Sequence, residues 1–178
     1  MSLFLATFLT GCFALLIGGL FAASQPALEA KIKRFPRSKT AAFILFGGSS
    51  LWFLYHVSNL GVADFGDIRH ILLGLFAVVG VGSFFFVRDF LAVRGLAMFF
   101  LLAGKAMLDA AYMQEPTQRL LMVTFVYCCI ALGLYLAASP FRLRDFFDWL
   151  FEKGSRARAF GIVLAAYGAA MILAAFTY

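Results

Sequence analysis

Charged residues are scarce in this chain, and acidic ones most of all. Among its 178 residues, 15 are Lys or Arg and only 9 are Asp or Glu, so 13% of the sequence is charged while 63% is hydrophobic. A soluble globular domain has about 25% charged residues. The shortage of charge, together with long uncharged runs, excludes an ordinary water-soluble fold.

Motifs of nucleotide-driven and metal-dependent enzymes are also missing. The chain has no G-x-x-x-x-G-K-[ST] loop, no G-x-G-x-x-G fingerprint, no C-x-x-C pair and no H-E-x-x-H helix motif. Its 3 cysteines, of which Cys128 and Cys129 are adjacent in an apolar run, lack the spacing of a ligand set. We therefore expect no cofactor and no catalytic residues, which argues against an enzyme.

Long apolar stretches dominate what is present. A membrane-spanning helix needs roughly 20 mostly apolar residues. The predicted spans cover residues 3–24, 40–60, 70–87, 90–112, 120–139 and 159–177. The connections between them are too short for a soluble domain, which needs about 50 residues. The sequence predicts a single all-α integral membrane domain of six transmembrane helices, arranged in three hairpins with short loops.

Basic residues fall mainly in alternate connections. The connections after the first, third and fifth spans contain Lys31, Lys33, Arg34, Arg37, Lys39, Arg88, Arg142, Arg144, Lys153, Arg156 and Arg158. The other two connections contain only Arg69 and Arg119. By the positive-inside rule, the basic connections face the cytoplasm. We expect a multi-pass protein of the bacterial inner membrane with both termini in the periplasm.

The same distribution accounts for the net charge of +6, so the charge does not require a nucleic-acid-binding role. The basic residues lie beside predicted spans, where they attract anionic lipid, and no exposed aromatic or helical reader accompanies them. The expected partner is the lipid bilayer, with a membrane-protein partner or a second copy of the chain as a further candidate.

An amphipathic segment follows the fifth span. Its apolar residues recur at i, i+3, i+4 and i+7 and share one helical face: Leu143, Phe146, Phe147 and Leu150. This pattern predicts an interfacial helix between the fifth and sixth spans, acting as an in-plane anchor or as a lipid- or partner-binding surface. Pro140 precedes it, and Pro26 precedes a similar basic segment after the first span, which suggests a parallel duplication.

Small residues spaced three or four apart predict close helix packing. They occur in the first, fifth and sixth spans as Gly11, Ala14 and Gly18, as Cys129, Gly133 and Ala137, and as Gly161, Ala165 and Ala169. In the second span, the run 47–50 reads Gly-Gly-Ser-Ser. We interpret this run as a close helix crossing, with a binding cleft as the alternative.

The fourth span is exceptional because it contains charges. Arg94, Lys105 and Asp109 fall on one stripe of the helix, and the last two form an i,i+4 pair that can neutralise itself. Arg94 can reach the headgroups, whereas Lys105 lies deep in the outer leaflet. A lone charge facing lipid costs roughly 2.5–3.5 kcal/mol at a helix centre. The stripe is expected to face other helices or a watery cavity.

Further polar residues surround the connection between the second and third spans. His56, Asp67 and His70 could meet Lys105 and Asp109 in an outward-facing pocket. Such a pocket could bind a small polar solute or relay protons, and two histidines could ligate haem or a metal. The alternative is a solvated loop beside a structural Lys105–Asp109 pair.

Three functional hypotheses follow. The first is a non-catalytic accessory or assembly subunit of a membrane complex, which the small size, absent motifs and packing stripes favour. The second is a small transporter or channel with its polar pocket at Lys105 and Asp109. The third is a haem- or metal-binding redox protein that uses His56 and His70.

Overall fold

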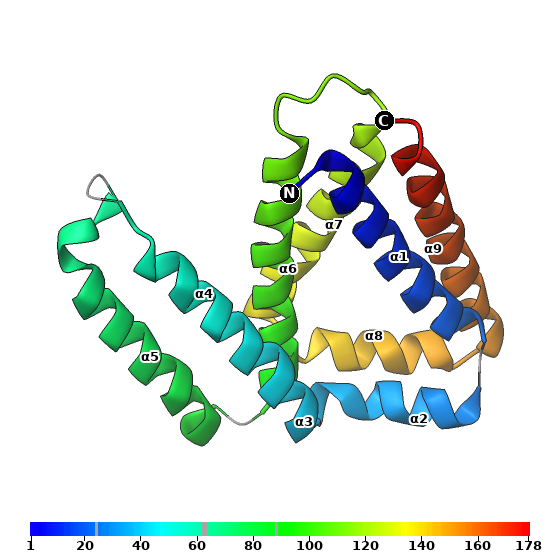
Figure 1. The fold of residues 1–178 in the computed structure, drawn as a ribbon. Coiled ribbons are helices and arrows are strands. Elements are labelled where there is room, and N and C mark those ends of the chain that lie inside the picture. Colours follow the sequence, from blue (N-terminus) through cyan, green and yellow to red (C-terminus); the bar gives the residue numbers. More distant parts are fainter. Residues whose placement is uncertain (24, 62–63, 88) are drawn as a thin grey trace.

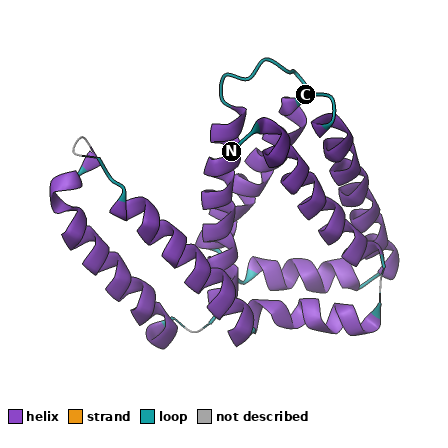
Figure 2. Ribbon diagram, viewed as in Figure 1, coloured by secondary structure: helices purple, strands orange, loops and turns teal. Residues whose placement is uncertain are grey.

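The computed structural model describes residues 1–23, 25–61, 64–87 and 89–178, and its regular elements are all helical (Figure 2). Six helical segments are long and apolar enough to cross a membrane: Leu3–Ala22, Lys39–Ser58, Gly66–Phe86, Leu91–Ala111, Arg119–Ala138 and Gly154–Ala175. Each overlaps its predicted span over most of its length. The predicted end of the first span, Ser24, and the basic residue Arg88 lie outside the described residues.

Short elements interrupt and connect these segments. In chain order, the elements are α1 (Leu3–Ala22), α2 (Pro26–Arg34), η1 (Phe35–Arg37), α3 (Lys39–Ala42), η2 (Phe43–Gly47), α4 (Gly48–Ser58), η4 (Gly66–Ile68), α5 (Arg69–Phe86), α6 (Leu91–Ala111), α7 (Arg119–Ala138), α8 (Arg142–Phe151) and α9 (Gly154–Ala175). The second segment is therefore composite, because the π-helical turn η2 separates α3 from α4.

The helices pack in three pairs: α1 with α9, α6 with α7, and α4 with α5 (Figure 1). The first and last segments thus form the most extensive helix pair. The prediction of three hairpins, each of two consecutive spans, is not confirmed. The reason is that α2 and α8 lie across one end of the molecule and carry the chain sideways to a different neighbour.

Glycines allow α1 and α9 to approach closely. A Cβ atom on Gly18 would overlap the backbone nitrogen of Ala165, and one on Gly161 would overlap that of Ala22. A Cβ on Gly11 would lie 2.9 Å from the carbonyl oxygen of Gly168. These backbones therefore meet without intervening side chains, as the small-residue stripes of the two spans predict.

The helix α6 is the central wall, with α7 on one side and α4 on the other. Gly104 and Gly133 lie at the α6–α7 contact, where a Cβ on Gly133 would be 3.2 Å from the oxygen of Ala97. On the other side, the Ser49 hydroxyl donates a hydrogen bond of 3.3 Å to the carbonyl of Gly95. Ser49 is buried at this helix crossing, whereas a Cβ atom on Gly48 would meet nothing within 4 Å.

The amphipathic helix predicted after the fifth span is confirmed as α8. Its residues Leu143, Phe147 and Leu150 are buried against the body of the molecule, while Trp149 is exposed. The shorter basic helix α2 runs beside it in the opposite direction (Figure 1). The two helices together form a floor at the end of the molecule opposite the chain termini.

The α1–α9 and α6–α7 pairs meet at the end that carries the termini. A buried cluster joins Ala6 of α1, Ala110 of α6, Met122 of α7 and Met171 of α9. Toward the floor the two pairs separate, and α8 fills the gap (Figure 1). A second buried cluster lies near the floor and takes residues from α1, α6, α7, α8 and α9, namely Phe21, Val93, Leu136, Leu150 and Ala157. The result is a tent-shaped body with the α4–α5 pair attached to its side.

Candidate functional site

The two charged residues in the C-terminal part of α6 form an ion pair with each other. The Nζ atom of Lys105 lies 2.6 Å from Oδ2 of Asp109, so the predicted i,i+4 ion pair is present. Their side chains are 62% and 65% exposed. No other described residue forms an ion pair or hydrogen bond with either side chain. The pair therefore lies on an exposed surface of α6.

Arg94 lies on the same helix near the floor and is partly buried. Its Nε atom is fully buried and has no hydrogen-bond partner among the described residues. The side chain lines a cavity of about 620 Å³ together with Asp89, Phe90 and Pro140. Arg94 is thus separated by three turns of helix from Lys105, and the predicted stripe is not one continuous polar site.

The other predicted residues lie apart from this ion pair. His56 stacks on Trp52 with ring centroids 6.3 Å apart. Asp67, in η4, and His70, at the start of α5, are both exposed. No hydrogen bond or ion pair among the described residues joins these three to Lys105 or Asp109. Nor do three His, Cys, Asp or Glu side chains approach closely enough there to hold a metal ion.

A large apolar cavity lies between the α1–α9 pair, the α6–α7 pair and the floor. Its volume is about 540 Å³. The walls come from α1, α9, α6 and α7, and the floor comes from α2 and α8. Representative lining residues are Phe13, Phe100, Leu132, Phe146 and Phe160. Apart from Lys31 of α2, all the side chains that line it are uncharged, and nearly all are hydrocarbon.

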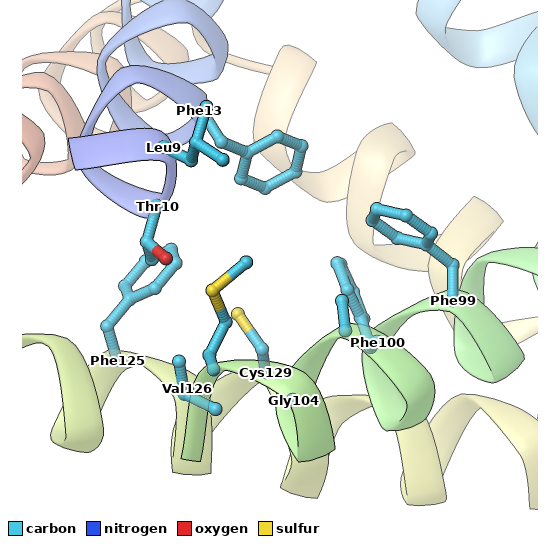
Figure 3. A pocket seen from close by; sticks show the side chains of 11 residues that line it. Leu9, Thr10, Phe13, Phe99, Phe100, Gly104, Phe125, Val126 and Cys129 are labelled. Atoms are coloured by element: carbon cyan, nitrogen blue, oxygen red, sulfur yellow. The ribbon is translucent and has the colours of Figure 1, made fainter. Parts of the chain in front are cut away.

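A second cavity of about 260 Å³ adjoins the first, farther from the floor. The two share four lining residues, Phe13, Phe100, Phe125 and Cys129, and we call the combined space the chamber. Figure 3 shows Leu9 and Phe13 extending from α1 toward Phe100 of α6 and Cys129 of α7.

The chamber is open to the outside, because lining residues such as Phe13, Leu132 and Phe160 are exposed. Water is bound well only where polar groups can hold it, and this lining offers few. The chamber therefore suits hydrocarbon better than water.

Sequence reasoning missed the chamber. Its lining residues are ordinary apolar side chains from eight elements, and in the sequence they look the same as lipid-facing or core residues. The one available signal was the amphipathic pattern of residues 143–150, which placed a helix across the end of the bundle. The space above that helix depends on how far apart the helix pairs stand.

No protein-family model, curated protein or solved structure matches this chain.

Proposed function

We propose that this chain is a non-catalytic subunit of a bacterial inner-membrane complex and that the α4–α5 pair is the arm that contacts its partner. Its six apolar segments are then membrane spans, and the basic floor formed by α2 and α8 faces the cytoplasm. The observation that carries the proposal is the lack of buried residues in α5. None of the residues in the apolar window of this segment is buried by the rest of the chain.

The arm is attached to the body through its first helix and not through α5. Contacts to α6 come from η1, α3, η2 and α4, whereas α5 packs chiefly on α4 and η2. Phe76 of α5 meets Phe53 of α4 with ring centroids 5.0 Å apart, and Phe84 meets Phe46 at 5.5 Å. The rest of α5 presents exposed aliphatic side chains, including Ile71 and Val78. Apart from Phe84, which packs against a buried cluster that includes Phe46 and Leu91, this segment leaves most of its apolar surface uncovered, and such a surface supports a role in assembly.

The Lys105–Asp109 pair supports a protein partner rather than lipid alone. Lipid tails provide no hydrogen-bonding groups, so an uncovered ion pair in the outer part of the span keeps part of its desolvation cost. A partner helix with a hydrogen-bonding side chain at that depth would satisfy the pair. Polar contacts of this kind between membrane helices contribute about 0.6 kcal/mol on average and up to about 2 kcal/mol. The partner we propose is therefore an apolar helix of another protein with one polar residue in its outer half.

Site-specific photocrosslinking in intact membranes tests this proposal. A photoreactive amino acid replaces Val78 on α5 or Val163 on α9, two valines with exposures of 72% and 71%. We expect Val78 to give one discrete protein adduct and Val163 to give lipid adducts only. The Val78 adduct should weaken when Lys105 and Asp109 are both replaced by Leu, because the partner's polar residue then loses its contact.

Two results would contradict the proposal. Lipid adducts alone from Val78 would show that the bilayer covers the arm. An adduct between two differently tagged copies of this chain would show a homo-oligomer instead of an accessory subunit.

A further inference from the structure

We propose that the chamber is a binding site for one anionic phospholipid of the cytoplasmic leaflet, with its acyl chains inside the chamber and its phosphate at Lys31. This inference goes beyond the proposed role in assembly and does not depend on the identity of any partner. It rests on the size of the chamber, its apolar lining and the position of its one charged residue.

The chamber matches the length of a lipid tail. Its lining on α1 extends from Leu9 to Phe21. Twelve residues of helix at roughly 1.5 Å each cover about 18 Å. One leaflet contributes about 15 Å of hydrocarbon, half of a core about 30 Å thick. An acyl chain that starts at the floor therefore reaches the far end of the chamber near the bilayer centre.

The lining determines the chemistry of the ligand. The side chains that line the upper cavity are apolar except for Thr10 and Cys129, and the Thr10 hydroxyl already donates a 2.8 Å hydrogen bond to the carbonyl of Ala6. No free polar group is available to orient a polar ring deep in the chamber. The ligand portion bound there is consequently plain hydrocarbon, as in a phospholipid tail.

The charge of the headgroup follows from Lys31. This exposed residue of α2 lines the chamber at the floor and has no ion-pair partner among the described residues. Its neighbour Lys33, by contrast, is 2.8 Å from Glu29 and lies over the ring of Phe151. Lys31 thus leaves one positive charge at the entrance of an apolar space. An amphiphile with a negative head and a hydrocarbon body complements both features.

The presence of the floor makes this site different from the outer surface of the protein, where lipid tails contact one helix face only. The helices α2 and α8 line the end of the chamber toward the aqueous side, where Ile32 and Phe147 contribute apolar side chains beside Lys31. The walls come from four different helices, so a tail inside contacts protein on several sides instead of one. Such a tail exchanges with bulk lipid more slowly than a tail on the outer surface of α5.

The amount of lipid that stays bound after extraction in detergent tests whether the chamber holds a phospholipid. The full chain is reconstituted in vesicles of equal phosphatidylglycerol and phosphatidylcholine, extracted again in mild detergent, and analysed for bound lipid by native mass spectrometry. We expect about one phospholipid per chain. Phosphatidylglycerol should be enriched about fivefold over phosphatidylcholine, the size expected for one basic residue at the membrane surface.

Matched variants separate the site from the surface. Leu132→Trp places an indole ring in the chamber and should reduce retention of both lipids, whereas Leu134→Trp, on the same helix but outside the chamber lining, should retain lipid like the wild type. Lys31→Gln should keep the lipid but remove the fivefold enrichment, while Lys33→Gln should preserve it. Because Lys31 is on the surface, Lys31→Gln should fold normally. The comparison of Lys31→Gln with Lys33→Gln therefore tests the proposal even if Leu132→Trp fails to fold.

Three outcomes would overturn the proposal. They are wild-type protein that retains no lipid, equal retention by the Leu132→Trp and Leu134→Trp variants, and enrichment that persists in Lys31→Gln. Photocrosslinking from Val78 is independent of all three, so the failure of this inference and the failure of the proposed subunit role can be told apart.

Discussion

Gly95 of α6 lies directly on the backbone of Phe46 in η2, so that a Cβ atom on Gly95 would overlap the nitrogen of Phe46. This contact and the hydrogen bond from Ser49 to Gly95 hold the second span against the fourth. Because the overlapping atom belongs to the backbone, it cannot rotate away as a side chain could. The α4–α5 pair is attached to the body at this point.

We predict that Gly95→Ala loosens this attachment. Forcing a methyl group into a tightly packed contact costs about 1–3 kcal/mol. The variant should show a lower Tm in mild detergent, and the fluorescence of Trp52 should change, since its ring lies 6.4 Å from that of Phe99 on α6. Gly74→Ala is the control, because a Cβ at Gly74 meets no atom within 4 Å. Equal Tm values for the two variants would show that the crossing is not tight.

Adjacent glycines in α1 provide a second test of packing. A Cβ on Gly18 would overlap Ala165 of α9, whereas a Cβ on Gly19 meets nothing within 4 Å. We predict that Gly18→Ala destabilises the chain by about 1–3 kcal/mol. Gly19→Ala should be neutral or stabilising by up to about 1 kcal/mol, since Ala is the better helix former. Denaturant titration in detergent, followed by circular dichroism, measures both, and similar midpoints would refute the α1–α9 crossing.

The sequence was informative where the signal is local. Apolar length alone predicts the six candidate spans, and the spacing of Leu143, Phe147 and Leu150 predicts α8, because these properties depend on neighbouring residues only. The Lys105–Asp109 ion pair was predictable for the same reason, since residues four apart on a helix lie side by side.

Partner choice between helices was not predictable in this way. The small-residue stripe around Gly18 indicates a close helix contact, but it does not predict that α9 is the helix packed against it. Gly168, which meets the carbonyl of Gly11, does not belong to the predicted stripe. The π-helical turn η2, before Gly48, changes which face of α4 meets α6. No residue in Phe43–Gly47 predicts this turn. The chamber depends on all of these choices together, so it emerges only in three dimensions.

Charge variants in α6 test how far the Lys105–Asp109 pair is needed. Lys105→Leu leaves Asp109 without its counter-ion, and Asp109→Leu does the same to Lys105. A lone charge costs roughly 2.5–3.5 kcal/mol at a helix centre on insertion scales, and less at Lys105 and Asp109, which lie toward the C-terminal end of α6. We predict that each single variant lowers the yield of membrane-inserted protein and that the double Leu variant restores it, as measured by quantitative immunoblotting of membrane fractions. A low yield of the double variant would show that the pair has a further structural role.

The transport hypothesis makes a separate prediction at the same residues. If the chain moves protons or ions, proteoliposomes loaded with a pH-sensitive dye should show a flux above that of empty vesicles, and Lys105→Ala should abolish it without changing the gel-filtration profile. As an accessory subunit, the chain should give no such flux in either form. A flux that is sensitive to Lys105 would therefore favour transport over the proposed subunit role.

The orientation of the chain can be checked with reporter fusions at Tyr178. The termini lie at one end of the molecule, and the basic helices α2 and α8 lie at the other (Figure 1). Because basic connections stay in the cytoplasm, we predict that a C-terminal alkaline phosphatase is active and that a C-terminal green fluorescent protein is dark. Fusions truncated after Lys153, between α8 and α9, should give the opposite pattern. A fluorescent C-terminal fusion would place the floor in the periplasm, and the headgroup at Lys31 would then belong to the other leaflet.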